Sequence, residues 1–330
     1  MLNNTAKLSL FERIEQYCMH YNLIKPHTTI VVGLSGGPDS VFLLYFLYSI
    51  QTRFNLTLIA AHVDHQWRSN SAQDVIFCQQ LAQSLGITFI SAQASSITLT
   101  RKHSSSKEEL GRLLRRAFFQ ELACKYNAHA IALAHHADDQ QETFFIRLIR
   151  GTTLSGLTSI WPKYDRYIRP LLNTHKTEIL AYLQEQSLNY LEDPTNQSDL
   201  FLRNRLRTQV LPILSTIDTR FDKNFAKTVD HLQNTELFLE RLTQQAFNVI
   251  TTQQDNLYWL DIDQFFGLDS FLHNRLLLMW LCKAQVPFTP STSLFKEITR
   301  FLSTKQAKRH TMYQTWVIIR DKNKAAVTLL

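Results

Sequence analysis

The first stretch of the chain that could do chemistry is Ser35-Gly36-Gly37-Pro38-Asp39-Ser40, which combines two glycines, two hydroxyls and one carboxylate. The apolar residues before it predict a buried strand, and those after it predict a helix. Glycines allow a tight turn and a close approach to a ligand, while proline suits the first turn of a helix. Backbone amides at a helix N-terminus attract anions, most often phosphate. We therefore expect a phosphate-binding turn here, with an ordinary strand-to-helix turn as the alternative.

This turn has no Gly-Lys-Ser/Thr sequence, so it is not the Walker loop, whose lysine holds β- and γ-phosphates. Its carboxylate, Asp39, could instead contact Mg²⁺, which commonly takes one or two carboxylates together with phosphate oxygens. The turn is therefore predicted to bind a nucleotide in a different way from the Walker loop.

A second chemical stretch is His135-His136-Ala137-Asp138-Asp139-Gln140-Gln141-Glu142-Thr143, which follows a strand-like apolar run. One aspartate could cap the helix that is predicted to begin here. That structural role does not explain both histidines and Glu142 as well. On a helix, Asp138 and Glu142 share a face, and His135 lies just before it. Such a group can hold a metal-bound polyphosphate and orient a proton acceptor.

A third group follows the second predicted strand, in the sequence His62-Val63-Asp64-His65-Gln66-Trp67-Arg68. Each histidine alone would more often be structural or solvated. Their grouping at the expected ligand edge makes a functional role about as plausible as a structural one. Zinc binding is not favoured, because no cysteine lies nearby and the spacing is not diagnostic.

Two basic helical segments could contact phosphates. The first carries Arg112, Arg115 and Arg116, of which Arg112 and Arg116 are four residues apart and share a face. The second is Arg203-Asn204-Arg205-Leu206-Arg207, in which Arg203 and Arg207 lie one helical turn apart. A solvated charged face is the alternative for both segments, and for the first segment it is the favoured one.

Strand-like and helical patterns alternate along the first half of the chain. This alternation predicts an α/β fold with a doubly wound, mainly parallel sheet. Ligands of such sheets bind beyond the carboxyl ends of the strands, where the polar groups above are found. The predicted strands are Thr29–Leu34, Leu56–His62, Thr88–Ala92 and Ala130–Ala134, and the helices between them are Asp39–Ile50, Ala72–Leu85 and Lys107–Tyr126.

The second half of the chain predicts a separate, smaller α+β domain. A long polar helical pattern, Phe221–Ile250, contains neither glycine nor proline and would link the two domains. We therefore place a catalytic domain at residues 1–216 and a smaller binding or packing domain at residues 217–330. The elements expected in the latter are a strand Leu257–Asp261, helices Ser270–Ala284 and Ser291–Leu302, and a hairpin pairing Thr311–Arg320 with Ala325–Leu330.

Composition limits the class of protein. The 330 residues carry a formal net charge of +7, which suits a polyanionic partner such as nucleic acid without demonstrating one. Four widely spaced cysteines form no Cys-x-x-Cys pair, so a zinc ribbon or redox pair is not indicated. The N-terminus does not resemble a signal peptide, and no apolar run is long enough to span a bilayer. We expect a cytoplasmic protein, without a membrane partner, and leave a homodimer open.

Taken together, these stretches resemble the tRNA(Ile)-lysidine synthetase family of the N-type ATP pyrophosphatase (PP-loop) superfamily. The resemblance covers roughly residues 28 to 215 and includes all the motifs quoted above. Further matching segments are Arg147-Leu148-Ile149-Arg150-Gly151, Gly156-Leu157, Arg169-Pro170-Leu171-Leu172 and Glu192-Asp193-Pro194-Thr195-Asn196. The order and spacing of these segments are more specific than the phosphate-binding turn alone.

The resemblance implies an adenine nucleotide alpha hydrolase-like fold, with ATP and Mg²⁺ as cofactors. It also implies that ATP adenylates the wobble cytidine of a CAU-anticodon tRNA(Ile), and that L-lysine then displaces AMP. Carried over, the implied catalytic residues are Asp139, His135, Glu142 and Arg112. The implied ATP-binding residues are Ser35, Gly36, Gly37, Pro38, Asp39, Ser40 and His62, with Asp39 also on the metal. The residues implied to bind tRNA are Arg203, Arg205 and Arg207.

Three positions depart from the family pattern: Gly111 stands where alanine is usual, Arg116 where tyrosine is usual, and Trp67 where a small or apolar residue is usual. The nearest alternative is a tRNA sulfur transferase, which would need cysteine pairs that this chain lacks. GMP or argininosuccinate synthetases fit the histidine and arginine motifs poorly. A non-catalytic nucleotide- or RNA-binding module would have no need for Asp39, Asp139 and Glu142 around a polyphosphate.

Overall fold

The computed structural model describes residues 8–67, 71–99, 106–192, 202–304, 308–313 and 315–330. They belong to two compact units, residues 1–232 and 233–330, and the long helix α10 (Phe221–Ile250) contributes to both. Each unit has its own hydrophobic core. The Arg68 of the third predicted group and most of the Glu192–Asn196 segment lie outside the described residues.

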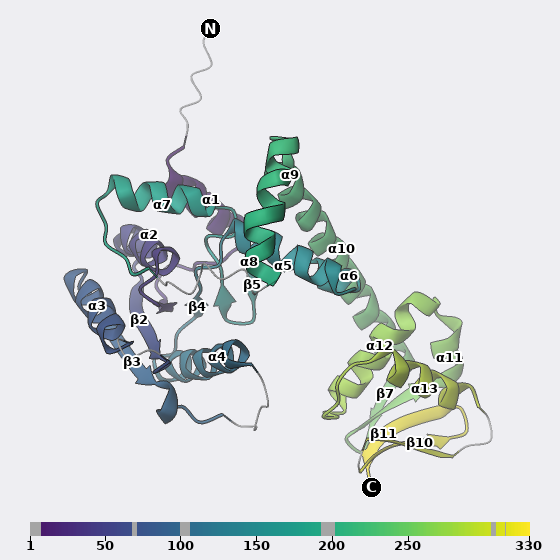
Figure 1. The fold of residues 1–330 in the computed structure, drawn as a ribbon. Coiled ribbons are helices and arrows are strands. Elements are labelled where there is room, and N and C mark those ends of the chain that lie inside the picture. The colour runs from purple at the N-terminus through teal and green to yellow at the C-terminus, as the bar shows by residue number, and fades with distance from the viewer. Residues whose placement is uncertain (1–7, 68–70, 100–105, 193–201, 305–307, 314) are drawn as a thin grey trace. The chain divides into compact units, whose positions relative to one another are not determined.

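The first unit is built on a six-stranded sheet with the strand order β3-β2-β1-β4-β6-β5 (Figure 1). All neighbouring strands are parallel except β5, which is antiparallel to β6. This confirms the predicted doubly wound α/β fold. The strands are β1 (Thr29–Gly33), β2 (Thr57–Asp64), β3 (Thr88–Gln93), β4 (Ala130–Ala132), β5 (Lys163–Tyr164) and β6 (Tyr167–Ile168).

Helices cover both faces of this sheet. Alternate residues of β1 point to opposite faces: Ile30 and Val32 pack in the core with α1, α2, α3 and α7, whereas Val31 packs in a second core with α4. Burial on both faces explains why the strands read as continuous apolar runs. The helices are α1 (Leu10–His20), α2 (Pro38–Phe54), α3 (Ser71–Ser84), α4 (Lys107–Lys125), α5 (Ala137–Ile149), α6 (Leu154–Leu157), α7 (Lys176–Glu185), α8 (Leu202–Arg205) and α9 (Leu211–Ile217), with a π-helical turn, Leu206–Val210, between the last two.

The two short strands β5 and β6 were not predicted, because two residues show no periodicity. Strand β6 is parallel to its neighbour β4, so both strands end at the same edge of the sheet. The residues that follow Ile168 therefore begin at the edge where those following β4 begin. Strand β2 extends two residues beyond its predicted end, so that Val63 and Asp64 also belong to the strand, and both His62 and Asp64 are buried.

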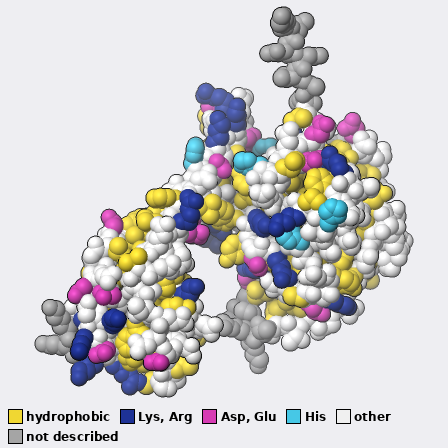
Figure 2. Space-filling view, turned by 180° about the vertical axis from the view of Figure 1, so that it is seen from behind, with side chains coloured by type: hydrophobic (Ala, Val, Ile, Leu, Met, Phe, Trp, Pro, Cys, Tyr) yellow, Lys and Arg dark blue, Asp and Glu magenta, His cyan; other side chains and the backbone are white. Residues whose placement is uncertain are grey.

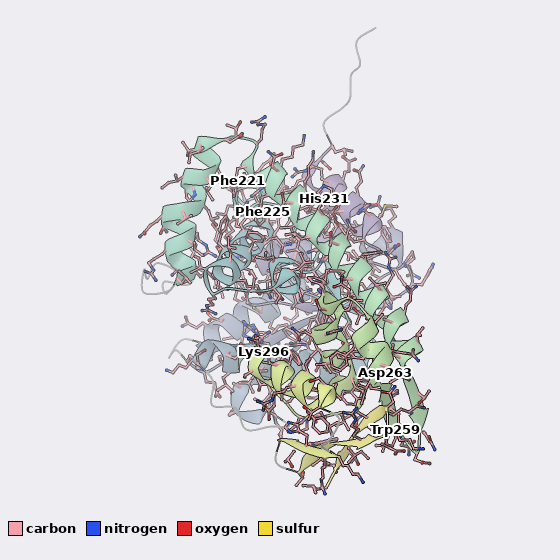
Figure 3. The ribbon with its side chains drawn as sticks, turned by 90° about the vertical axis from the view of Figure 1, so that its right-hand side faces the viewer. Phe221, Phe225, His231, Trp259, Asp263 and Lys296 are labelled. Atoms are coloured by element: carbon pink, nitrogen blue, oxygen red, sulfur yellow. The ribbon has the colours of Figure 1, made fainter. Side chains whose placement is uncertain are left out.

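The second unit combines an antiparallel sheet with helices, which agrees with the predicted α+β class. The strand order is β7-β8-β11-β10-β9, and the core is centred on Trp280, whose indole N–H donates to the carbonyl of Tyr258 at 2.8 Å. Figure 3 labels Trp259, Asp263 and Lys296 in this unit. Its elements are β7 (Thr251–Gln254), β8 (Leu257–Asp261), α11 (Ile262–Gly267), α12 (Ser270–Lys283), α13 (Thr292–Ser303), β9 (Arg309–Tyr313), β10 (Trp316–Asp321) and β11 (Lys324–Leu329).

One element of the second unit was predicted incorrectly. The segment predicted as one strand, Thr311–Arg320, forms parts of two antiparallel strands, β9 and β10, so the expected hairpin is a three-stranded meander. The pairing of β10 with β11 around Lys322 and Asn323 is as predicted.

The division between the units falls inside α10, between residues 232 and 233, rather than at residue 216 before that helix. The first turns of α10 carry Phe221 and Phe225 (Figure 3), and Phe225 packs against Phe144 and Phe145 of α5. Near the other end of the helix, Phe247 lies in the core of the second unit. The helix thus packs in both units and is not a solvated linker.

Candidate active site

The two strongest chemical stretches meet at the switch point of the sheet. Strand β1 leads into the loop Ser35–Ser40 and α2, and its neighbour β4 leads into His135 and α5. The next strand on the other side of β1 is β2, so the strand order reverses here. A crevice at the carboxyl ends of the strands is the expected ligand site in such a sheet. The fold therefore brings together residues that are about 100 positions apart in the sequence.

The loop has a fixed conformation. Gly36 has φ +84°, and a Cβ there would come within 2.6 Å of the side chain of Leu191, so only glycine fits. The Ser40 hydroxyl accepts from the Ser35 N–H at 3.1 Å and donates to the Gly37 carbonyl at 2.9 Å. Ser40 is buried, whereas Ser35 is exposed. Ser40 therefore braces the turn, and Ser35 presents its hydroxyl at the surface.

Gly37 and Pro38 set the direction of α2. Gly37 is the N-cap residue and Pro38 is the first helical residue, as the sequence predicted. The N-cap residue Gly37 has no side chain that could cap this helix, so the first amides of α2 stay available to an anionic ligand.

Three carboxylates surround the buried imidazole of His136. Its Nε2 lies 3.8 Å from Asp39 and 3.5 Å from Asp139, and its Nδ1 lies 3.8 Å from Asp138. The backbone N–H of His136 also donates to Asp139 at 3.1 Å. His136 thus links the phosphate loop to the first turn of α5. His136 was not among the residues predicted to act in the reaction.

The start of α7 completes this cluster with two residues that the sequence analysis missed. The Nζ of Lys176 lies 2.5 Å from the Asp39 carboxylate. His175 bonds Asp138 through Nδ1 at 2.8 Å, and this hydrogen bond raises the pKa of His175. Burial would raise the pKa of Asp138, but His175 and His136 outweigh it and lower that pKa. Both residues of the pair are therefore favoured in their charged forms.

His135 and Asp139 have different charge states. Burial lowers the pKa of His135 to about 4, and the nearby arginines Arg169 and Arg203 contribute in the same direction. Burial would raise the pKa of Asp139, but His136 and His135 outweigh it and lower that pKa. Near neutral pH the site therefore contains a neutral His135 beside an ionised Asp139. The Nδ1 of His135 is buried and has no hydrogen-bond partner among the described residues.

Glu142 is fully buried one turn further along α5 and holds two arginines. It forms ion pairs with the Nε of Arg203 at 2.9 Å and the Nε of Arg207 at 2.7 Å. Burial raises the pKa of Glu142 in spite of these arginines. Arg203 and Arg207 were predicted to share a helical face, and their side chains do point to the same side, because both contact the Glu142 carboxylate.

Three other candidate residues lie apart from this cluster. His62 is buried beneath the loop, where its Nδ1 contacts the Leu34 carbonyl at 2.9 Å. Arg112 is exposed on α4 and pairs with Glu109 at 2.7 Å; none of its contacts within the described part of the chain reaches the His135–Glu142 stretch. Arg205 is exposed on α8.

Asp39 could supply one carboxylate ligand to a hard cation such as Mg²⁺, but the residues around it do not form a complete set of ligands. Among the described residues, no group of three or more His, Cys, Asp or Glu side chains is arranged to hold a metal. Asp39 is partly exposed, and Mg²⁺ typically takes one or two carboxylates and completes its shell with phosphate oxygens and water. Asp39 therefore fits a cation that arrives with a nucleotide.

The residues that the sequence analysis missed share one cause. His175 and Lys176 follow the unpredicted strand β6, which places them beside the site, and Arg169, which was quoted among the family segments without a role, follows that strand directly. The segment Arg169-Pro170-Leu171-Leu172 was the available signal, since it is extended and precedes a helix. Figure 2 shows Lys, Arg and His side chains near one another on the visible face of the first unit, with acidic side chains on the same face.

No helix in the described residues is both long enough and apolar enough to cross a bilayer.

Comparison with known proteins places this site in a family. Residues 7–214 match the PP-loop domain family. A tRNA(Ile)-lysidine synthase of Bacillus cereus is 33% identical over 309 residues, covering 91% of this chain and 65% of that protein. One of Bacillus subtilis (strain 168) is 37% identical over 298 residues, covering 88% of this chain and 62% of that protein. The chain thus spans less than two thirds of the length of these curated relatives.

A solved structure supports the fold alone. The U34-tRNA thiolase NcsA from Methanococcus maripaludis, with its 4Fe-4S cluster, matches with a TM-score of 0.58 and 19% identity. The match covers 67% of this chain and 78% of that chain.

Proposed function

The chain belongs to the PP-loop domain family, and from this premise we propose that it is an ATP-dependent ligase that joins lysine to the wobble cytidine of a CAU-anticodon tRNA(Ile). One observation carries the proposal: the chain is 33% and 37% identical to two tRNA(Ile)-lysidine synthases over about nine tenths of its length, the site included. ATP and tRNA as substrates also suit a cytoplasmic protein.

The proposed reaction has two steps. In the first, the C2 oxygen of the cytidine attacks the α-phosphorus of ATP, the bond to the β-phosphate breaks, and pyrophosphate leaves. In the second, the ε-nitrogen of lysine attacks C2, the C2–O bond breaks, and AMP leaves with that oxygen while the nitrogen gives up a proton. The product is lysidine, which pairs with A rather than G, so the tRNA would read AUA instead of AUG.

We assign the pyrophosphate part of ATP to the loop. The uncapped amides at the start of α2 and the exposed Ser35 hydroxyl would bind its oxygens, and Ser40 would keep the turn in shape. Asp39 would hold Mg²⁺, which when bound offsets the negative charge of the phosphates. His62 would act from below, by fixing the Leu34 carbonyl at the start of the loop.

We assign the attack on C2 to the first turns of α5. Ionised Asp139 would draw the lysine ammonium to the adenylated cytidine and accept its proton, and neutral His135 would orient the intermediate. The buried Glu142 would hold Arg203 and Arg207 in place near the reacting groups. Arg112 is supported only by the family resemblance, since its guanidinium pairs with Glu109.

We assign contacts with tRNA phosphates to Arg203, Arg205 and Arg207. The side chains of Arg203 and Arg207 remain about two fifths exposed (39% and 43%), although each pairs with Glu142. The net charge of +7 supports binding to a polyanion.

The test is incubation of the protein with labelled lysine, ATP and CAU-anticodon tRNA. The expected result is labelled tRNA with release of AMP and pyrophosphate. Transfer of sulfur, or ATP cleavage without a tRNA product, would overturn the proposal.

Two substitutions test the assigned carboxylates. Asp39→Asn and Asp139→Asn should abolish lysine incorporation while tRNA binding survives. Asp263→Asn, an exposed position in the second unit (Figure 3), is the matched control and should keep full activity. Normal incorporation by either site variant would remove that residue from the mechanism.

A further inference from the structure

The carboxyl end of β2 carries an aromatic pair that the proposed mechanism does not use. The ring of Trp67 stacks on that of His65, with ring centroids 4.5 Å apart and an interplanar angle of 21°. His65 covers one face of the indole, yet 50% of the Trp67 surface remains exposed. A large aromatic ring with an exposed surface is a feature of sites that bind another flat ring.

The backbone of α4 holds this pair in place. Gly111 of α4 has no room for a side chain, because a Cβ there would lie 2.7 Å from Cη2 of Trp67 and 3.2 Å from Cε1 of His65. Glycine inside a helix is less stable than alanine, so this close contact has a cost in helix stability. The contact fixes the indole before any ligand arrives, which lowers the entropy lost on binding.

The surroundings favour a nucleotide ligand over a hydrophobic one. Burial lowers the pKa of His65 to about 4, with a further contribution from Arg115, so the ring beneath the indole is neutral near neutral pH. Arg112 and Arg115 are exposed on α4 immediately after Gly111. Aromatic rings beside basic side chains are the usual means by which proteins stack on unpaired bases.

The pair also directly follows β2, the strand next to the one that leads into the phosphate loop. His62, five residues before Trp67, contacts the carbonyl of Leu34, from which the loop begins. A base attached to phosphates at the site is therefore a ligand of suitable chemistry for Trp67.

We propose that Trp67, supported by His65 and Gly111, is a stacking platform for a nucleobase. The inference rests on the proposed function, which supplies two sources of such a base: the adenine of ATP and an unpaired base of the tRNA. The indole would contribute affinity through stacking and would not read the identity of the base by hydrogen bonds.

The first test distinguishes two roles of Trp67: stacking on a base, and apolar packing against α4. Trp67→Leu keeps an apolar side chain over the helix but removes the large π-surface, and Trp67→Phe keeps a smaller one. Trp67→Leu should weaken either ATP or tRNA binding by about 5- to 150-fold, from a stacking contribution of about 1–3 kcal/mol, with Trp67→Phe in between. Loss of ATP affinity alone assigns adenine to the platform, and loss of tRNA affinity alone assigns a tRNA base. Both affinities unchanged would overturn the proposal.

The second test moves the indole without altering it. Gly111→Ala should displace Trp67 and weaken the same affinity in the wild-type background, but it should have little effect in the Trp67→Leu background, where the clashing ring is absent. Equal effects in the two backgrounds would contradict the proposed support by Gly111. Thermal unfolding of every variant shows whether a lower affinity reflects loss of fold.

A third measurement distinguishes this inference from the proposed function. Each binding assay needs no turnover, so the platform can be tested even in a protein that fails to incorporate lysine. Quenching of tryptophan emission by the bound ligand should be smaller in Trp67→Phe than in the wild type. Quenching of equal size in both proteins would assign it to another tryptophan and count against the platform.

Discussion

The substitution Glu142→Gln separates the chemical role of this carboxylate from its role in stability. Glu142 is fully buried and forms ion pairs with Arg203 at 2.9 Å and Arg207 at 2.7 Å. Glutamine has nearly the same shape and can still accept a hydrogen bond, but it carries no charge. We expect this variant to stay folded and to lose most of its activity.

Two opposing effects determine its stability. The charged hydrogen bond from Arg207 contributes about 1.5–3 kcal/mol and the ion pair with Arg203 adds to it, but the guanidiniums keep access to water, which reduces the loss. In the other direction, burial raises the pKa of Glu142 in spite of both arginines, so the ionised carboxylate is less stable in the fold than in the unfolded chain. Glutamine removes that cost. The expected net change is within about 1 kcal/mol, or roughly 2–4 °C in Tm for a unit of this size.

The pH dependence of stability gives an independent check. An acid with a raised pKa binds more protons in the folded state than in the unfolded state over the interval between its two pKa values. Glu142 therefore favours the fold below its ordinary pKa of 4.5, and this contribution is lost as the pH rises through the higher folded value. The free energy of unfolding of Glu142→Gln should fall less than that of the wild type across this interval.

Two assays read out the result. Circular dichroism gives Tm, and lysine transfer to tRNA gives kcat/KM. Loss of one charged interaction in the transition state, about 1.5–3 kcal/mol, should lower kcat/KM by about 10- to 150-fold. Glu15→Gln, which breaks a Glu–Arg pair between α1 and α2, is the matched control and should keep its activity.

Either of two outcomes would refute this account of Glu142. A Tm far below that of the wild type, with activity lost only through unfolding, would make the carboxylate mainly structural. Full activity in a stable Glu142→Gln variant would show that its charge is not needed for the reaction.

Three further predictions concern the residues around Asp39. Lys176→Met should lower the free energy of unfolding by about 1–2 kcal/mol without nucleotide, because Asp39 loses its ammonium partner; thermal unfolding should show a smaller difference with Mg-ATP present. In the wild type, His175 stabilises the fold below pH 6.5, and this contribution is lost as the pH rises through its raised pKa. His175→Gln should remove the contribution, so its free energy of unfolding plotted against pH should be flatter than that of the wild type. Gly36→Ala should weaken ATP binding, measured by titration calorimetry, by at least about 10-fold, because its φ of +84° is strained by about 1–2 kcal/mol for alanine and its Cβ has no space.

The sequence predicts most of the first unit because its strands are buried on both faces. The predicted strand Thr29–Leu34 differs by one residue from β1, and the predicted helix Lys107–Tyr126 differs by one from α4. Continuous apolar runs between amphipathic helices are a strong local signal, since each reflects burial of the residue's own side chain. The carboxyl edge of such a sheet then indicates where the polar groups must meet.

The contacts of Asp39 with His136 and Lys176 could not be predicted from such local patterns. Lys176 lies 137 residues from its partner Asp39. Lys176 begins α7, which follows β6, and that strand has two residues and no pattern to detect. His136 was visible in the sequence, but its position between three carboxylates depends on the turn from β4 into α5. Local patterns do not encode such a tertiary arrangement.

Arg203 and Arg207 show a different limit of sequence reasoning. Their spacing predicted a shared face and allowed two partners, solvent or phosphate, whereas the structure adds a third, the carboxylate of Glu142, which lies 65 residues before Arg207. Pairing with that carboxylate neutralises part of the charge that tRNA phosphates would meet. These two arginines should therefore release fewer counterions on binding tRNA than two free arginines would, while the exposed Arg205 keeps its full charge. The buried carboxylate thus links the proposed phosphate contacts to α5, which carries Asp139 and begins two residues after His135, so movement of either arginine on tRNA binding would be transmitted to the start of this helix.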